Sequence, residues 1–184
     1  MLLSNHCLST ASLIPSPHQD ARPDPEDISL LVIHCISLPP GEYGGGHIDA
    51  LFQGQLATDH PYFASIAHLK VSAHLLIDRA GQLTQFVPFD RRAWHAGASC
   101  YQGRARCNDF SIGIELEGTD TSPFTDAQYD ALHSVIALLL HHYPRLSPQR
   151  IVGHSDIAPG RKTDPGHGFD WPRLRRELEL ATHT

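Results

Sequence analysis

Residues 29–37 read SLLVIHCIS, a run in which leucine, valine and isoleucine occupy both alternating faces. Successive side chains of a strand point to opposite faces of its sheet, so a strand that is apolar on both faces has to be covered on both sides. The run stops at Pro39-Pro40-Gly41, and a glycine-rich stretch follows over residues 41–46. This segment therefore predicts a central strand of a sheet with other layers packed on both faces.

Strand and helix patterns alternate along the rest of the chain, which is typical of an α/β fold with one main sheet. In the clearest helix Thr125 is a potential N-cap with Gln128 three residues on, a capping-box pattern, and apolar residues follow at helical spacing. The chain of 184 residues is long enough for one domain with a sizeable core. The predicted elements are strands at residues 71–77, 82–89, 111–118 and 149–154, short helices within 47–70, and helices at 126–142 and 171–180, the last capped by Asp170.

Three segments are predicted to lack regular structure. Residues 1–28 contain four prolines, and we expect this irregular N-terminal segment to pack on the domain that residues 29–184 form. Residues 91–110 predict a long loop, and a loop of that length in a compact domain is usually functional. Residues 155–169 are interrupted by proline and glycine throughout.

The composition excludes several classes of protein. With 41% hydrophobic and 18% charged residues the chain is globular, and its net charge of −6 disfavours a nucleic-acid partner. No window approaches the roughly 20 apolar residues of a membrane span, and the N-terminus lacks the features of a secretory signal. The four cysteines show no CxxC spacing, so we expect free thiols in a reducing cytoplasm. We expect no membrane partner and a monomer.

Three polar residues occupy positions where polar groups are costly. His34 lies within the apolar strand, His154 ends a second apolar strand, and Asp164 follows ten residues later in the proline- and glycine-rich loop. Each histidine on its own is more often a core residue bonded to a carbonyl group, and it is their pattern with the proline- and glycine-rich loop that favours a metal. Two imidazoles and one carboxylate that converge on a metal would leave a fourth tetrahedral position for water, which is the arrangement of catalytic zinc.

Several long motifs, in matching order over roughly residues 12–175, resemble the zinc-dependent N-acetylmuramoyl-L-alanine amidases of the amidase_2 family, and within it the cytoplasmic AmpD branch. The motifs are PSPHQDARP (15–23), LLVIHCISLPPGEYGG (30–45), HPYFASIAHLKVSAHLLIDRAG (60–81), RAWHAGASCYQGRARCNDFSIGIELEGTDT (92–121) and GHSDIAPGRKTDPG (153–166). The resemblance implies a mixed central sheet flanked by helices. It implies hydrolysis of the amide between the lactyl group of a muramoyl sugar and L-alanine, with a small 1,6-anhydro-muropeptide from wall recycling as substrate.

The resemblance also assigns roles to residues. It implies one zinc ion bound by His34, His154 and Asp164, with Glu115 as the catalytic base and Lys162 as the group that stabilises the transition state.

The pattern alone leaves two of these roles open. Glu115 and Glu117 face the same side of a strand, so Glu117 is the alternative base. Lys162 by itself could equally be a solvated loop residue.

Five further residues are predicted to bind substrate. Trp94 and His95 stand together in the long loop, where an aromatic ring can stack on a sugar, and Arg106 can pair with a carboxylate of the stem peptide. A packed tryptophan and a solvated arginine are the alternatives. Cys35 stands where members of the family usually carry Asn, and Lys70 where they often carry Arg. The side chain of Cys35 should point away from the side of the strand that carries the metal ligand.

Two other functions are compatible with these motifs. A non-catalytic peptidoglycan-binding module could share the fold, although such modules commonly lack a metal ligand. An exported amidase could act on the polymeric wall instead of on a small muropeptide.

Overall fold

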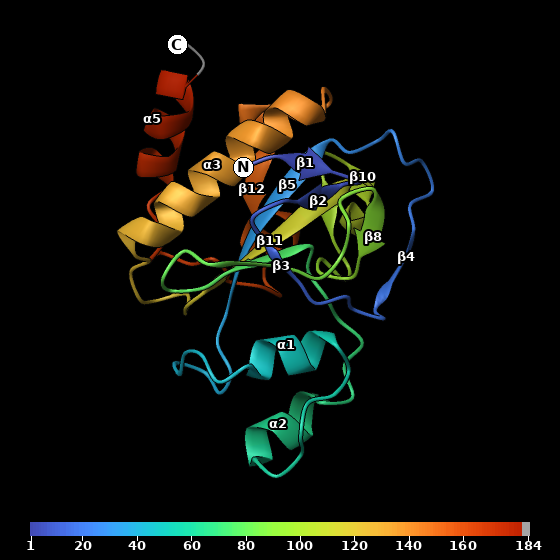
Figure 1. Cartoon of the computed structure of the whole chain (residues 1–184), viewed down its shortest axis with the longest axis vertical. Helices are drawn as coiled ribbons and strands as arrows, with labels where there is room; N and C mark the ends of the chain where they lie inside the picture. Colours follow the sequence, from blue (N-terminus) through green and yellow to red (C-terminus); the bar gives the residue numbers. More distant parts are fainter. Residues whose placement is uncertain (182–184) are drawn as a thin grey trace.

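The computed structural model describes residues 1–181, and its centre is a mixed six-stranded sheet (Figure 1). The strand order is β12 (Ile151–Gly153), β5 (Leu30–Ile36), β11 (Ser111–Glu117), β6 (Leu75–Ile77), β7 (Leu83–Gln85) and β3 (Ser12–Leu13). The first four strands of this order are parallel to one another, β7 runs antiparallel to β6, and β3 runs parallel to β7. The predicted mixed sheet in a single α/β domain is thus confirmed.

The two longest strands, β5 and β11, lie side by side in the middle of the sheet and are paired along their whole length. One face of these two strands carries apolar side chains, and their polar side chains lie on the other face. Leu31 and Ile33 of β5 join Ile112 and Ile114 of β11 in the largest apolar core. The other face of β5 carries the polar residue His34, whose register partner on β11 is Glu115. The predicted central strand is therefore covered on both faces, with the polar residues on one of them.

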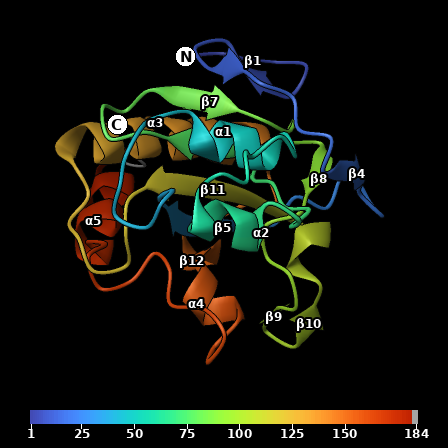
Figure 2. The ribbon, with the colours of Figure 1, turned by 90° about the horizontal axis from the view of Figure 1, so that it is seen from below.

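Helices α3 (Asp126–His142) and α5 (Trp171–Ala181) lie together on one side of the sheet (Figures 1 and 2). Helix α3 begins where the sequence predicts, because the capping box forms: the Thr125 hydroxyl accepts from the Gln128 N–H, and the Gln128 amide accepts from the Thr125 N–H, both at 3.1 Å. The Asp170 carboxylate accepts from the Arg173 N–H at the start of α5. Both predicted caps are confirmed.

Two short helices, α1 (His47–Phe52) and α2 (Pro61–Ile66), lie beyond the carboxyl end of β5 (Figure 1). They pack on a second apolar cluster that includes Leu76 of β6 and Phe86 after β7. These helices, with the loops that follow the parallel strands, leave a cavity at that end of the sheet.

The structure differs from the prediction in the segments read as irregular. Within residues 1–28 lie β1 (Leu3–Ser4), β2 (Cys7–Leu8), β3 and β4 (Gln19–Ala21), and the predicted loop 91–110 contains β8 (Arg91–Ala93), β9 (Cys100–Tyr101), β10 (Arg104–Ala105) and the 3-10 helix η1 (Cys107–Asp109). These elements are too short to show a periodic pattern in the sequence.

The end of the chain also differs in detail. The predicted strand 149–154 is the 3-10 helix η2 (Pro148–Arg150) followed by β12, and His154 begins the one-turn helix α4 (His154–Ile157) instead of ending the strand. The predicted strands 71–77 and 82–89 are shorter, as β6 and β7. In the described part of the chain, no helix is both long and apolar enough to span a membrane.

Candidate active site

A cavity of about 550 Å³ opens at the carboxyl ends of β5 and β11. Ligands of open α/β sheets bind at this end of the strands. The cavity is lined by His34 and Glu115 from the strands, by Tyr62 and Ile66 of α2, by the loop at Trp94, and by the segment 161–164.

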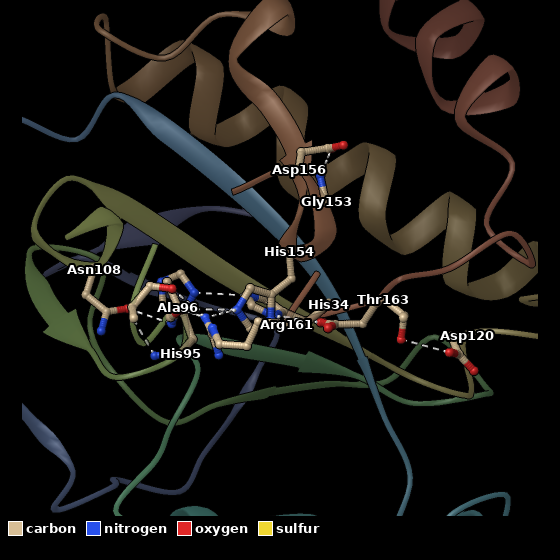
Figure 3. Close-up of polar contacts among 12 residues, drawn as sticks. His34, His95, Ala96, Asn108, Asp120, Gly153, His154, Asp156, Arg161 and Thr163 are labelled. Atoms are coloured by element: carbon tan, nitrogen blue, oxygen red, sulfur yellow. Dashed lines mark hydrogen bonds and ion pairs between the residues drawn. The ribbon is translucent and has the colours of Figure 1, made fainter. Parts of the chain in front are cut away.

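The side chains of His34, His154 and Asp164 converge in this cavity, and the two histidines are labelled in Figure 3. His34 Nδ1 lies 3.0 Å from His154 Nδ1, and the same Asp164 Oδ2 atom lies 3.0 Å from His34 Nδ1 and 3.1 Å from His154 Nδ1. The two imidazoles are almost fully buried, and burial lowers the pKa of His34 to about 4, so this ring is neutral near pH 7. The sequence prediction that these residues come together is confirmed.

The donor set fits a zinc ion. Zinc bonds of about 2.0 Å place tetrahedral ligand atoms roughly 3.3 Å apart, close to the separations in the cluster. Two neutral imidazole nitrogens and a carboxylate oxygen are ligands that zinc prefers. In the residues that the structure describes, these three form the group of histidine, cysteine and acidic side chains whose geometry suits a metal.

Backbone contacts place the ligands that lie outside β5. Ser155 donates its N–H to the Asp164 carbonyl at 3.0 Å, which ties the loop that carries Asp164 to helix α4. A side chain at Gly153 would meet Pro165 Cδ at 2.9 Å, so the loop packs closely because residue 153 is a glycine. The His154 and Asp164 side chains are in this way held next to each other.

Glu115 lies beside the ligand cluster on the same face of the sheet as His34, its register partner. Its Oε2 atom is buried and, among the residues that the structure describes, has no hydrogen-bond partner. Burial and the nearby charge of Asp164 hold the pKa of Glu115 well above its ordinary value, although Lys162 acts in the opposite direction. Lys162 itself is exposed on the cavity lining.

Glu117, the alternative base, has a different environment. Its Oε1 accepts from the Gly44 N–H at 2.5 Å and its Oε2 from the Arg79 N–H at 3.3 Å. Both carboxylate oxygens are used to hold backbone, and Glu117 is absent from the lining of the cavity described above.

The aromatic pair of the long loop lies at the cavity. Trp94 is half-buried in the cavity wall, where its Nε1 donates to Asp20 at 3.2 Å and its ring stacks on His18. His95 also borders the cavity, but its two ring nitrogens contact His34 and Ser111. Polar contacts of His95 are thus directed to protein groups.

The remaining predicted substrate residues lie at or outside the edge of the cavity. Arg106 is 72% exposed, pairs with Asp109 at 3.2 Å, and borders a second cavity of about 420 Å³ that shares the wall formed by Trp94. Lys70 is exposed and absent from the lining of the first cavity. Cys35 is half-buried beside that cavity and packs against the α3 side of the core, opposite His34, as the strand alternation predicts.

Several residues around the ligands were not predicted from the sequence. Thr163 donates to Asp120 at 2.9 Å, and Arg161 donates to the carbonyls of Ala96 and Ala98 at 2.7 Å (Figure 3). Arg161 and Thr163 flank Lys162 in the sequence, and this adjacency to a predicted site residue is the one sequence feature that could have indicated them. Asn108, which holds the loop at residue 95, carries no signal in the sequence.

Comparison with known proteins agrees with this site. Residues 24–167 match the family described as N-acetylmuramoyl-L-alanine amidase, Amidase_2, and the chain belongs to this family. The resemblance drawn from the sequence motifs is confirmed.

Individual proteins of known function or structure show which members of the family the chain is similar to. The chain is 60% identical over 184 residues to the 1,6-anhydro-N-acetylmuramyl-L-alanine amidase AmpD of Salmonella typhimurium (strain SL1344), an alignment that covers 100% of this chain and 98% of that protein. A crystal structure of a selenomethionine AmpD derivative superposes with a TM-score of 0.94 at 61% identity and covers 97% of this chain and 99% of that one. The amidase AmiD from E. coli, in complex with the substrate anhydro-N-acetylmuramic acid-L-Ala-D-γ-Glu-L-Lys, gives a TM-score of 0.61 at 32% identity over 82% of this chain and 57% of that one.

Proposed function

We propose that this amidase is a zinc-dependent hydrolase of 1,6-anhydro-N-acetylmuramoyl peptides that cleaves the bond between the lactyl group and L-alanine in peptidoglycan recycling. The observation that carries the proposal is the convergence of three candidate ligand atoms within 3.1 Å of one another, beside a buried carboxylate oxygen that has no hydrogen-bond partner in the part of the chain that the structure describes. The names of the AmpD relatives and the substrate bound to AmiD support the choice of substrate.

His34, His154 and Asp164 would hold the zinc ion. When bound, zinc lowers the pKa of a coordinated water to about 7 and polarises the carbonyl group of the scissile amide. A set of buried metal-donor atoms that already converge needs little rearrangement to bind the ion.

The carboxylate of Glu115 performs the proton transfers. Its Oε2 accepts a proton from water as the water oxygen forms a bond to the lactyl carbonyl carbon. It then returns that proton to the amide nitrogen as the carbon–nitrogen bond breaks. The products are a lactyl carboxylic acid, which then loses its proton to the solvent, and a peptide with a free L-alanine amine.

The cation of Lys162 stabilises the negative charge that develops on the carbonyl oxygen in the transition state. Trp94 supplies an aromatic wall for the sugar, and Arg106 a guanidinium at the outer edge for a stem-peptide carboxylate. Cys35 borders the cavity and could contact the substrate there, whereas Lys70 lies outside the cavity lining and would contact only a part of the substrate that extends beyond it. The proposed enzyme works in the cytoplasm as a monomer, and its four free cysteines agree with a reducing compartment.

The test is elemental analysis of the purified protein together with mass spectrometry of its products from anhydro-muropeptide. We expect one zinc per chain and a product pair separated at the lactyl–alanine bond. A protein that binds muropeptide without zinc and without cleavage would instead be a binding module. Faster cleavage of intact sacculi than of anhydro-muropeptide would indicate an enzyme of the polymeric wall.

Removal of one ligand tests the metal assignment. Asp164→Ala should lose zinc and turnover together, because two imidazoles alone hold the ion weakly. The control is Asp59→Ala, which removes an exposed carboxylate outside the cavity lining and should leave both unchanged. Wild-type zinc content in Asp164→Ala would contradict the proposed ligand set.

A further inference from the structure

Both histidines of the ligand cluster contact one two-residue segment, His95–Ala96, through the nitrogen that faces away from the cluster (Figure 3). His34 Nε2 lies 2.9 Å from His95 Nδ1, and His154 Nε2 lies 3.1 Å from the Ala96 carbonyl oxygen. A neutral imidazole that gives its Nδ1 lone pair to a metal carries its proton on Nε2. A carbonyl oxygen only accepts, so Ala96 favours this tautomer of His154.

The contact with His34 needs a partner that accepts through a ring nitrogen. With its Nδ1 as acceptor, His95 carries its own proton on Nε2, which lies 3.1 Å from the Ser111 hydroxyl oxygen. His34 therefore donates a hydrogen bond to His95, and His95 donates one to the hydroxyl oxygen of Ser111. This order leaves His34 Nδ1 unprotonated where it meets Asp164.

Strand β11 leaves room for the ring of His95. A side chain at Gly113 would come within 2.4–2.7 Å of three atoms of this ring, so the ring occupies the space that any larger residue would fill. Ser111, Gly113 and Glu115 share one face of β11, and His95 thus packs against the strand that carries the proposed base.

One carboxamide aligns the two-residue segment. Asn108 Oδ1 accepts from the His95 N–H at 3.1 Å and from the Ala96 N–H at 2.8 Å. Asn108 belongs to η1, and its carbonyl accepts from the buried guanidinium of Arg22 at 3.2 Å. On the other side of the segment, the Ala96 carbonyl also accepts from Arg161.

We propose that His95 and Asn108 are positioning residues for the metal: His95 orients His34 directly, and Asn108 holds the His95–Ala96 segment so that both imidazoles present an unprotonated Nδ1. This inference rests on the proposed function only in taking the bound group to be zinc. Neither residue is a ligand, and neither touches the reacting atoms. Partners of metal ligands of this kind typically change metal affinity by 10–100-fold when they are removed.

The test compares two matched pairs of variants by chelator competition for zinc on the folded apo protein. Asn108→Leu removes the acceptor at similar size, whereas Asn108→Asp keeps it. His95→Phe removes the ring acceptor, whereas the side-chain oxygen of His95→Asn lies near the position of Nδ1. We expect Asn108→Leu and His95→Phe to weaken zinc binding by about 10–100-fold. The conservative variants Asn108→Asp and His95→Asn should bind zinc with an affinity within about threefold of that of the wild type.

Two further measurements separate positioning from general stability. The d–d absorption of the cobalt-substituted protein should change in Asn108→Leu and His95→Phe, and persist in the conservative partners, because it reports ligand geometry. A residue that only stabilises the loop would lower the apo unfolding midpoint while zinc affinity and the cobalt spectrum stayed those of the wild type. That result in both pairs would overturn the inference. If Asn108→Leu does not fold, the His95 pair decides alone.

The proposed function fails in a different way, since it fails when the wild-type protein neither binds zinc nor cleaves anhydro-muropeptide. A wild type that does both, with variants of unchanged affinity, would leave the function in place and exclude this role for His95 and Asn108.

Discussion

Glu115 and Glu117 show how the surroundings of one residue type decide its role. They are two residues apart on β11 and point to the same face. Glu117 accepts a backbone N–H on each carboxylate oxygen and so anchors two loops. One buried oxygen of Glu115 has no hydrogen-bond partner among residues 1–181, and the raised pKa of Glu115 makes it readier to hold a proton. A group that has to accept and return a proton needs this freedom.

The first prediction at this scale concerns Glu115→Gln, which keeps the shape of the side chain and removes its basic oxygen. We expect zinc content to stay at one per chain and kcat to fall by roughly 10²–10⁴-fold, measured by product formation from anhydro-muropeptide. Glu117→Gln is the matched control, and it should lower the free energy of unfolding by about 1 kcal/mol while kcat stays within a few fold. If Glu117→Gln lost turnover and Glu115→Gln kept it, the two roles would be reversed.

At the scale of elements, those with their own periodic pattern were predictable. Strand β5 is a long apolar run, strand β11 alternates apolar residues with polar or small ones, and α3 carries its capping box and apolar stripe within one segment. Strand β8 was missed because it has three residues and is stabilised by β4, about seventy residues earlier in the chain. A pairing of this kind depends on side chains that a local pattern does not include.

The same reasoning applies to the candidate site. His34 and His154 are predictable because one lies within an apolar run and the other directly follows one, and the two side chains do converge with Asp164. The support from Asn108 was not predictable, because a side-chain oxygen that accepts from two consecutive backbone N–H groups depends on loop geometry. The sequence could suggest the proposed ligands, but not the residues proposed to orient them.

The pairing of β4 with β8 leads to a prediction on pH. Asp20 and Arg92 are register partners and form a bidentate ion pair, with both distances 2.6 Å, and Asp20 also accepts from Trp94. The hydrogen bond from Arg92 lowers the pKa of Asp20, although burial opposes this. The folded-state pKa lies below that of the unfolded chain, so the stabilisation is complete above about pH 4 and is lost as the pH falls through the folded-state value.

Asp20→Asn removes this titration. We expect the variant to be less stable than the wild type by on the order of 0.5 kcal/mol at pH 6, and the difference to narrow between pH 4 and pH 3. Urea unfolding of both proteins at pH 6, 4 and 3 measures it. A difference that is as large at pH 3 as at pH 6 would show that the ionised form of Asp20 does not contribute.

At the scale of the whole molecule, stability and chemistry are assigned to opposite faces of the same two strands. On β5, Leu31 and Ile33 point into the core beneath α3, whereas His34 points to the cavity. On β11, Ile114 and Glu115 divide in the same way. The residues proposed to bind the metal and to move the proton therefore need not contribute to the main apolar core.

Leu132 in the middle of α3 tests this separation. It is fully buried in the core on the face opposite the ligand cluster, so Leu132→Ala leaves a cavity that should cost about 2–5 kcal/mol in the free energy of unfolding. At a temperature where the variant is still folded, we expect zinc affinity and kcat to stay within about twofold of the wild type, because sites that are far apart and share no partners usually act independently. Urea denaturation, chelator competition and product formation on one preparation supply the three values. A loss of zinc affinity that parallels the loss of stability would mean that α3 sets the geometry of the ligands through the sheet, and that the two faces act as one unit.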